Sequence, residues 1–210
     1  MKALVENPLA GLRAALPQTP QDNVGRDDYA LYPEKRQARS SLVPASVLIP
    51  VIAHPEPTVL FTQRTAHLSH HSGQVSFPGG RREAHDLSPV QTALRETMEE
   101  TGIDPAHVSL AGFLPRYLTG TGFDISPVVG VLAPGFALNP DPREVADVFE
   151  VPLSFFLDPA NVQQASRDRD GWFHTFYIFE PPGRHIWGIT AAMLFDLSGR
   201  LRTARAIEAP

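Results

Sequence analysis

The chain has 210 residues, the size of one large domain or of one domain with an arm. Its formal net charge of −5 argues against a broad basic surface for duplex nucleic acid. The absence of cysteine excludes disulfides, thiolate nucleophiles, zinc fingers and cysteine-held iron–sulfur clusters. The longest apolar run, residues 42–53, is too short to span a membrane, and the first residues lack a secretory signal. We therefore expect a cytoplasmic protein with no nucleic-acid or membrane partner.

The predicted elements begin with an N-terminal arm, residues 1–40, which is polar and irregular apart from a short helix over Asn7–Leu16. Residues 41–210 are predicted to form one domain. Short apolar or β-branched runs in it predict strands; these are Ser46–Ala53, Thr58–Gln63, Gln74–Phe77, Val108–Leu114, Ile125–Leu132, Val145–Val151, Phe173–Phe179 and His185–Trp187. Helices are predicted over Pro89–Thr101, Leu153–Leu157 and Thr190–Asp196. Many strands without regular βαβ alternation indicate a mixed α+β fold.

The helix over Pro89–Thr101 carries the strongest local signals. Ser88 is a plausible N-cap before a proline at the first helical position, and Gln91 completes a capping box. Gly102 is placed to end the helix in the left-handed conformation. One side is predicted to be apolar and to face the core; its members are Val90, Ala93, Leu94, Thr97 and Met98.

Three glutamates lie on one arc of this helix, roughly opposite the apolar stripe. Glu96, Glu99 and Glu100 repel one another at these spacings, and they sit where the helix dipole disfavours anions. Arg95 is the nearby cation on the helix. A hard divalent cation would turn the repulsion into a binding site. Spacing alone leaves two readings open, a metal site and a solvated acidic face.

The context of the glutamates resembles the Nudix box of the Nudix hydrolases. Gly79-Gly80 comes first, and the stretch from Arg95 to Ile103 reads Arg-Glu-Thr-Met-Glu-Glu-Thr-Gly-Ile. The box has Gly, five residues, Glu, seven residues, then Arg-Glu-U-x-Glu-Glu-x-Gly-U, where U is apolar. Here the middle acid is Asp86, eight residues separate it from Arg95, and Thr97 occupies a U position.

The resemblance implies a fold, a cofactor and roles for residues. The fold would be an α/β/α sandwich with a mixed β-sheet and a loop–helix–loop metal site. Glu96, Glu99 and Glu100 would bind Mg²⁺ or Mn²⁺, with the Gly80 carbonyl as a further ligand and Glu99 and Glu100 acting in catalysis. Arg95 would orient a glutamate and hold the loop. Such metals neutralise a pyrophosphate and activate water, so no covalent nucleophile is needed.

The segment before the box resembles the coenzyme A (CoA) pyrophosphatase branch of the family. That signature runs Leu-Leu-Thr-x-Arg-Ser/Ala, x3, Arg, x3, Gly, x3, Phe-Pro-Gly-Gly, and here it starts at Leu60 and ends at Gly80. Ser69 replaces the second arginine of the signature; His67, His70 and His71 lie nearby. The substrate-binding residues implied are Arg64, Gly73, Phe77 and Gly79. Arginine suits phosphate and glycine allows close backbone approach, although a strand and turn alone would also use these glycines.

Two later segments resemble the same branch. Glu144, after Asp141-Pro142-Arg143, is a candidate for a further metal ligand or for the general base, and an exposed loop acid is the alternative. The segment Ile186–Ala191 resembles the start of the C-terminal helix of the branch. There Trp187 is expected to pack in the core and Thr190 to cap the helix.

The implied reaction is hydrolysis of CoA, or of a CoA derivative, to 4′-phosphopantetheine and adenosine 3′,5′-bisphosphate. One alternative is a Nudix pyrophosphatase for another nucleoside diphosphate derivative, such as ADP-ribose, NADH or a dinucleotide. Another is a nucleotide-binding Nudix module without catalysis. The expected partner is a small-molecule substrate, and the arm is long enough to leave a homodimer open.

Overall fold

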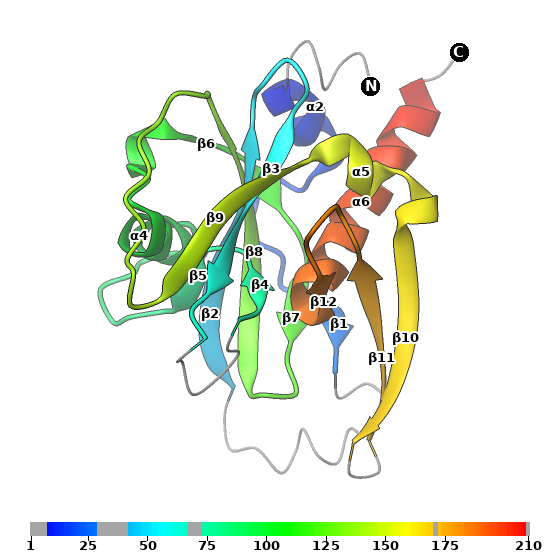
Figure 1. Cartoon of the computed structure of the whole chain (residues 1–210). Coiled ribbons are helices and arrows are strands. Elements are labelled where there is room, and N and C mark those ends of the chain that lie inside the picture. The colour runs from blue at the N-terminus through cyan, green and yellow to red at the C-terminus, as the bar shows by residue number, and fades with distance from the viewer. Residues whose placement is uncertain (1–7, 29–41, 67–72, 170–171, 209–210) are drawn as a thin grey trace.

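The computed structural model describes residues 8–28, 42–66, 73–169 and 172–208 (Figure 1). Its helices are α2 (Pro8–Ala15), α4 (Pro89–Thr101), α5 (Leu153–Leu157) and α6 (Gly188–Glu208), with 3₁₀ turns η1 (Pro105–His107) and η2 (Pro159–Asn161). The strands are β1 (Val24–Asp27), β2 (Val43–Ile52), β3 (Thr58–Arg64), β4 (Val75–Ser76), β5 (Gly79–Arg81), β6 (Val108–Phe113), β7 (Arg116–Leu118), β8 (Phe123–Leu132), β9 (Val145–Pro152), β10 (Val162–Arg169), β11 (Trp172–Phe179) and β12 (Ile186–Trp187).

A nine-stranded mixed sheet forms the middle layer, with the order β1-β7-β8-β2-β3-β4; β5 pairs with β2, β6 with β8 and β9 with β3. The pairs β2–β8 and β1–β7 are parallel, whereas β3 runs antiparallel to β2, β4 and β9. A second, three-stranded sheet has the order β10-β11-β12. Figure 1 shows α4 on one side of the large sheet and α5 and α6 on the other. The predicted α+β sandwich with a mixed sheet is confirmed.

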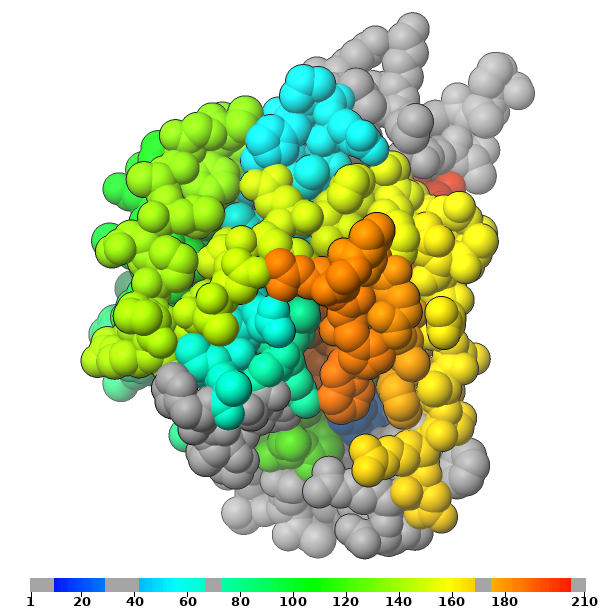
Figure 2. Space-filling view, in the orientation of Figure 1, coloured from blue at the N-terminus to red at the C-terminus, as the bar shows by residue number. Residues whose placement is uncertain are grey.

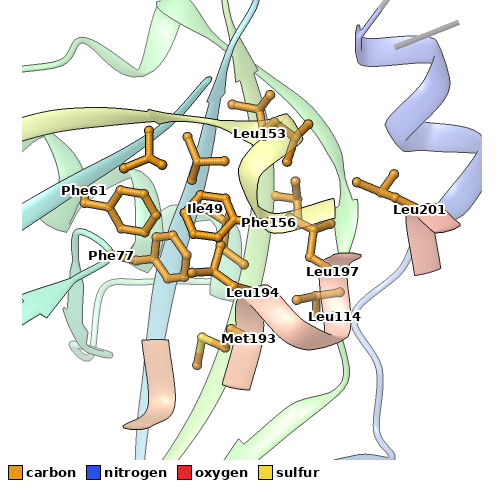
Figure 3. Packing of buried hydrophobic residues seen from close by; sticks show 14 of the residues in the cluster. Ile49, Phe61, Phe77, Leu114, Leu153, Phe156, Met193, Leu194, Leu197 and Leu201 are labelled. Atoms are coloured by element: carbon orange, nitrogen blue, oxygen red, sulfur yellow. The ribbon is translucent and has the colours of Figure 1, made fainter. Parts of the chain in front are cut away.

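Side-chain alternation along the central strands explains the layers, because successive residues of a strand point to opposite faces. On β2, Leu48 packs in a cluster with Ala93 of α4, whereas Ile49 joins the large core on the opposite face. That larger core gathers aromatic and aliphatic side chains from β3, α5 and α6, including Phe61, Phe156 and Leu194 (Figure 3). Both faces of the sheet are therefore buried, and α4, which carries the predicted metal ligands, packs on one of them.

The described part of the N-terminal arm belongs to this architecture. The predicted short helix is present as α2, and Leu12 and Leu16 are buried in the large core. Residues 24–27, which the sequence analysis left irregular, form β1 and pair in parallel with β7. Arg26 also forms an ion pair with Asp196 of α6 at 2.6 Å. The sequence of β1 has no alternation of apolar residues that would predict a strand. Its main-chain pairing with β7 makes it one.

Several element boundaries differ from the prediction. The last helix runs from Gly188 to Glu208 and not from Thr190 to Asp196, because Leu197 and Leu201 continue its buried face past Ser198-Gly199. Strands β5, β7 and β10 were not predicted. β10 is polar and exposed along most of its length, and main-chain pairing with β11 makes it a strand. Among the described residues, no helix has the length and apolar character needed to cross a membrane.

Candidate active site

The ends of α4 are fixed as the sequence predicts. The Ser88 hydroxyl accepts a hydrogen bond from the Gln91 amide at 3.2 Å. The Gln91 side chain in turn accepts one from the Leu87 amide at 2.6 Å, one residue before the N-cap. Gly102 has φ of +76° and donates its amide hydrogen to the Met98 carbonyl. The helix is therefore held rigidly at both ends, which keeps the side chains between them in place.

The two faces of α4 differ from the prediction at two positions. Met98, assigned to the apolar stripe, is 52% exposed, whereas Glu100, assigned to the opposite arc, is only 6% exposed. The buried Thr97, at the apolar position of the box, donates its hydroxyl to the Ala93 carbonyl at 2.6 Å. The helix turns Glu100 toward β5 and Met98 toward solvent. This burial rules out a uniformly solvated acidic face.

Asp86, the middle acid of the box, is buried and holds Arg95. Its carboxylate accepts hydrogen bonds from Nε and Nη2 of Arg95, from the Thr92 hydroxyl and from the Glu83 amide, at 2.9–3.2 Å. The Arg95 guanidinium lowers the pKa of Asp86 below its usual range, and the hydrogen bond to Asp86 raises the pKa of Arg95. Both shifts favour the charged forms, so the pair is an ion pair at neutral pH.

The other edge of the Arg95 guanidinium faces the glutamates. Nη1 lies 2.9 Å from Glu99 and 3.0 Å from Glu96, and Nη2 donates to the Arg81 carbonyl at 2.9 Å. Arg95 thus joins the loop, the β5 strand and two of the candidate ligands. This geometry supports a positioning role, as the resemblance implies.

The glycine pair of β5 lies against the glutamates. A Cβ at Gly80 would collide with the Glu96 carboxylate, and one at Gly79 would collide with the Ser46 carbonyl of β2. Gly79 has φ of +155°, and its amide donates to Glu100 at 3.4 Å. Glycine at these positions leaves room for the β2 main chain beside Gly79 and for the Glu96 carboxylate beside Gly80.

Burial and neighbouring negative charges raise the pKa of two acids of the site, Glu96 and Glu100. Burial raises the pKa of Glu100 to about 8 against the opposing effect of the Arg64 guanidinium, and the negative charges of Glu96 and Glu144 add smaller contributions to the rise. Burial also raises the pKa of Glu96, and Glu99 and Glu144 add to it. Negative charge is therefore concentrated here, and a cation would relieve it.

Arg64, the predicted phosphate-binding residue, ends β3 beside Glu100. Its Nη1 lies 3.8 Å from the Glu100 carboxylate, which is too long for a hydrogen bond. Its Nε atom is buried and has no hydrogen-bond partner among the described residues. The register between β3 and β9 shifts between Gln63 and Arg64, an irregularity of the kind that redirects a side chain. A half-buried guanidinium with an unpaired Nε donor is suited to an anion.

Glu144 reaches the site through the loop that precedes β9. The Asn139 amide bonds to the Thr101 carbonyl at 2.8 Å, and the Asp141 amide bonds to the Glu100 carbonyl at 3.1 Å, so this loop follows the end of α4. The Glu144 carbonyl accepts from the Thr65 amide at 2.9 Å. The Glu144 side chain is exposed, and its charge acts on Glu96 and Glu100.

The site fits a hard divalent cation by its donors. Among the residues that the structure describes, no group of three or more acidic or histidine side chains is arranged to hold a metal; Glu96 and Glu99 point to Arg95 instead. The carboxylates of Glu96 and Glu100 are nevertheless on adjacent turns beside β5, with their pKa values raised. Glutamate side chains rotate about several bonds, and their carboxylate oxygens are the ligands that Mg²⁺ and Mn²⁺ prefer.

Of the remaining predicted residues, the structure describes Phe77 and Gly73 but not the segment between Arg64 and Gly73 that contains the histidines. Phe77 is buried, stacks on Phe61 at 5.2 Å between ring centroids, and lines a cavity beside Arg64. Gly73 has φ of +69°, which suits a turn. The segment with His67, Ser69, His70 and His71 lies outside the described residues.

Two expectations for the start of α6 are wrong. Trp187 is only half-buried and lines the same cavity. Thr190 lies inside α6 and donates its hydroxyl to the Val75 carbonyl of β4 at 3.1 Å, so it does not cap the helix. The aliphatic side chains of Ile189 and Met193 also line this cavity, and sequence reasoning assigned them no role.

Comparison with known proteins agrees with this geometry. Residues 43–176 match the family model described as the NUDIX domain. A protein of Photorhabdus laumondii named uncharacterized Nudix hydrolase NudL is 38% identical over 181 residues, covering 86% of this chain and 97% of that protein. A protein of the same name from Pectobacterium atrosepticum is 40% identical over 154 residues, covering 73% of this chain and 80% of that protein. The chain belongs to the Nudix hydrolase family.

Proposed function

We propose that this Nudix hydrolase is a divalent-metal-dependent pyrophosphatase that cleaves CoA or its derivatives. The reaction is CoA + H₂O → 4′-phosphopantetheine + adenosine 3′,5′-bisphosphate. One observation carries the proposal: Arg64 lies 3.8 Å from the buried Glu100 and also lines the cavity that contains Phe77 and Trp187. A pyrophosphate bound at Arg64 would lie between the acidic helix and this cavity.

Glu96, Glu99 and Glu100 are the residues that would hold Mg²⁺ or Mn²⁺, with the Gly80 carbonyl beside them. When bound, the cation supplies charge neutralisation for the phosphate oxygens and lowers the pKa of a nearby water. Glu100 is the central member, since burial and the charges around it raise its pKa to about 8. Arg64 adds a guanidinium with an unpaired buried donor for a phosphate oxygen.

Glu144 is proposed as the general base. It is exposed to solvent, unlike Glu100, and it lies on a separate loop whose charge acts on both Glu96 and Glu100. A carboxylate in that place can take the proton of an attacking water. Arg95 is proposed as a positioning residue, because its guanidinium contacts Glu96 and Glu99 and is itself anchored by Asp86.

The choice of CoA among pyrophosphates rests on the segment from Leu60 to Gly80, whose Arg64, Gly73 and Phe77-Pro78-Gly79-Gly80 match the branch signature. The structure is compatible with that choice, since Arg64, Phe77 and Gly79 line one cavity although they are apart in sequence.

Product analysis with purified protein tests the proposal. CoA, 3′-dephospho-CoA, ADP-ribose and NADH are incubated separately with Mg²⁺, with Mn²⁺ and with EDTA. We expect metal-dependent release of 4′-phosphopantetheine from CoA at a kcat/KM at least tenfold above that for ADP-ribose or NADH. Cleavage of ADP-ribose or NADH without cleavage of CoA would refute the substrate assignment. Binding without turnover would refute the enzyme assignment.

A further inference from the structure

A cavity of about 290 Å³ opens beside the candidate active site, between the sheet and the start of α6. Arg64 and Gly79 line it on the side of the acidic helix, and Trp187 and Ile189 line it on the side of α6. Figure 1 shows β4, β12 and the first turn of α6 close together at this place. In the space-filling view the orange surface that leads to β12 lies beside the blue-green surface of β4 and its neighbours (Figure 2).

The lining of the cavity is mainly hydrocarbon and aromatic. Val47 and Ile125 come from the large sheet, Phe77 from the loop before β5, and Met193 from α6. Among the described residues, Arg64 is the only charged side chain that lines it. The cavity thus has one cationic side and an otherwise largely apolar wall, and the cationic side is shared with the candidate phosphate site.

The wall formed by Trp187 is held firmly. The Phe176 and Trp187 rings make an edge contact at 5.8 Å between centroids. Arg184, shortly before β12, donates to Gln63 at 2.7 Å and lies 3.8 Å from the centre of the Phe149 ring. The Thr190 hydroxyl ties α6 to β4. A cavity with fixed walls is suited to recognising shape, because little order is lost on binding.

The two halves of CoA differ in the chemistry they present next to the pyrophosphate. One half is pantetheine, which begins with a methylene and a carbon bearing two methyl groups. The other is an adenosine whose ribose carries a 2′-hydroxyl and a 3′-phosphate dianion. Burying that dianion against hydrocarbon without a second cation is costly, whereas burying methyl groups is favourable.

We infer that the cavity lined by Trp187, Ile189 and Met193 binds the pantetheine half of the substrate, next to the phosphate held by Arg64. This inference rests on the proposed function and identifies where its specificity arises. ADP-ribose presents a second ribose at the same place. Its hydroxyls would lose hydrogen bonds to water in an apolar cavity, so the cavity selects CoA over ADP-ribose.

Two variants and a matched control test the inference. Trp187→Ala removes the aromatic wall, and Ile189→Gln places an amide in the cavity. Ile178→Ala is the control, because Ile178 pairs with Trp187 across β11 and β12 but does not line the cavity. Circular dichroism checks that each variant is folded. The probes are CoA turnover and calorimetric titration with 4′-phosphopantetheine and, separately, adenosine 3′,5′-bisphosphate.

We expect both cavity variants to raise the KM for CoA and the Kd for 4′-phosphopantetheine by about tenfold, the effect of losing one well-packed apolar contact. The Kd for adenosine 3′,5′-bisphosphate should stay within twofold, and Ile178→Ala should change none of the three values. Weaker binding of adenosine 3′,5′-bisphosphate alone, or unchanged binding of both products, would overturn the inference while CoA turnover by the wild type still stands. Failure of the wild type to cleave CoA would overturn the proposed function and, with it, this inference.

Discussion

Asp86 and Arg95 form a paired unit on which the position of the acidic cluster depends. Nη2 of Arg95 lies 2.9 Å from Oδ2 of Asp86, and Nη1 of the same guanidinium contacts Glu96 and Glu99. Asp86 is 4% exposed, and its carboxylate accepts hydrogen bonds from Arg95, Thr92 and the Glu83 amide but from neither of these glutamates. Its influence on the glutamates is therefore transmitted through one arginine.

Asp86→Asn should lower both stability and activity. The substitution removes the negative charge opposite Arg95 and leaves a partly buried cation without its partner. We expect the free energy of unfolding to fall by roughly 2–3 kcal/mol. The freed guanidinium should also hold Glu96 and Glu99 more tightly and weaken metal affinity. Urea unfolding and Mn²⁺ titration measure the two effects.

Thr92→Val is the matched control for Asp86→Asn. It removes one hydrogen bond to the same carboxylate, at 3.1 Å, and keeps the charge pair. We expect a loss of about 1 kcal/mol in stability with unchanged metal affinity. If both variants lowered metal affinity equally, Asp86 would act only as a structural residue.

Glu100→Gln should abolish most activity while making the metal-free protein more stable. The substitution keeps the shape of a buried side chain and removes its charge, so kcat should fall at least about a hundredfold, or roughly 2.7 kcal/mol. The melting temperature in EDTA at pH 8 should rise, because a buried carboxylate no longer has to ionise. Turnover within twofold of the wild type would refute the assignment of Glu100.

The stability of the metal-free protein should fall as pH rises through the range in which Glu100 ionises. Its folded-state pKa of about 8 exceeds its ordinary value of 4.5. Between these values the folded protein retains a proton that the unfolded chain has released, so stability decreases by up to about 1.4 kcal/mol per pH unit.

Melting temperatures in EDTA across pH 5–9 measure this slope, which Glu100→Gln should flatten. Glu56→Gln, an exposed acid that bonds to Ser154, should leave the slope as in the wild type. Saturating Mg²⁺ should reduce or reverse the slope, because the cation binds the ionised carboxylate. If the melting temperatures of the wild type and of Glu100→Gln fell equally with pH, Glu100 would not be the group that causes the pH dependence.

Alanine substitutions at Gly79 and Gly80 should affect different properties, stability at Gly79 and activity at Gly80. At Gly80 a Cβ would meet the flexible end of Glu96, so Gly80→Ala should keep the fold and lower kcat/KM by displacing that carboxylate. At Gly79 it would meet the Ser46 main chain, at a positive φ, so Gly79→Ala should cost roughly 1–3 kcal/mol of stability. Thermal unfolding and steady-state kinetics of the two variants separate these effects.

Glu144→Gln should lower kcat by about 10²–10⁴-fold, the usual contribution of a general base, with little change in Mn²⁺ affinity. Asp141→Asn is a suitable control, because Asp141 shapes the same loop by accepting from Arg143 without belonging to the acidic cluster. Mn²⁺ titration by electron paramagnetic resonance reports affinity independently of turnover. A large loss of Mn²⁺ affinity in Glu144→Gln would make it a metal ligand instead.

Local signals in the sequence were sufficient for the parts of the fold that local interactions determine. Helix α4 matches its predicted bounds, because Ser88, Pro89 and Gly102 mark its ends chemically. Strands such as β8 follow from their apolar residues. β5 and β10 could not be found this way, since Gly79-Gly80-Arg81 and the polar residues of β10 become strands only by pairing with β2 and β11.

In the candidate site too, local sequence predicts some features, and contacts between distant segments determine the others. The motif selects the acidic residues, but it does not reveal that Glu100 is buried while Met98 is exposed, because helical spacing carries no information on which neighbouring strand covers the helix. Nor does it reveal that Arg64 and Trp187, which are far apart in sequence, line one cavity. An aromatic residue followed by Gly188, at the first position of a long helix, was a signal that could have drawn attention to this cavity.

The pairing of β1 with β7 has a consequence for how the chain acquires its structure. Val24 meets Arg116, and Asp27 meets Leu118, so the early strand has no partner until the middle of the chain has been synthesised. Leu12 and Leu16 are buried with residues of α6, which is synthesised later than β7. Such distant contacts slow folding. On the ribosome, α2 and β1 would emerge well before β7 and α6, the elements against which they pack.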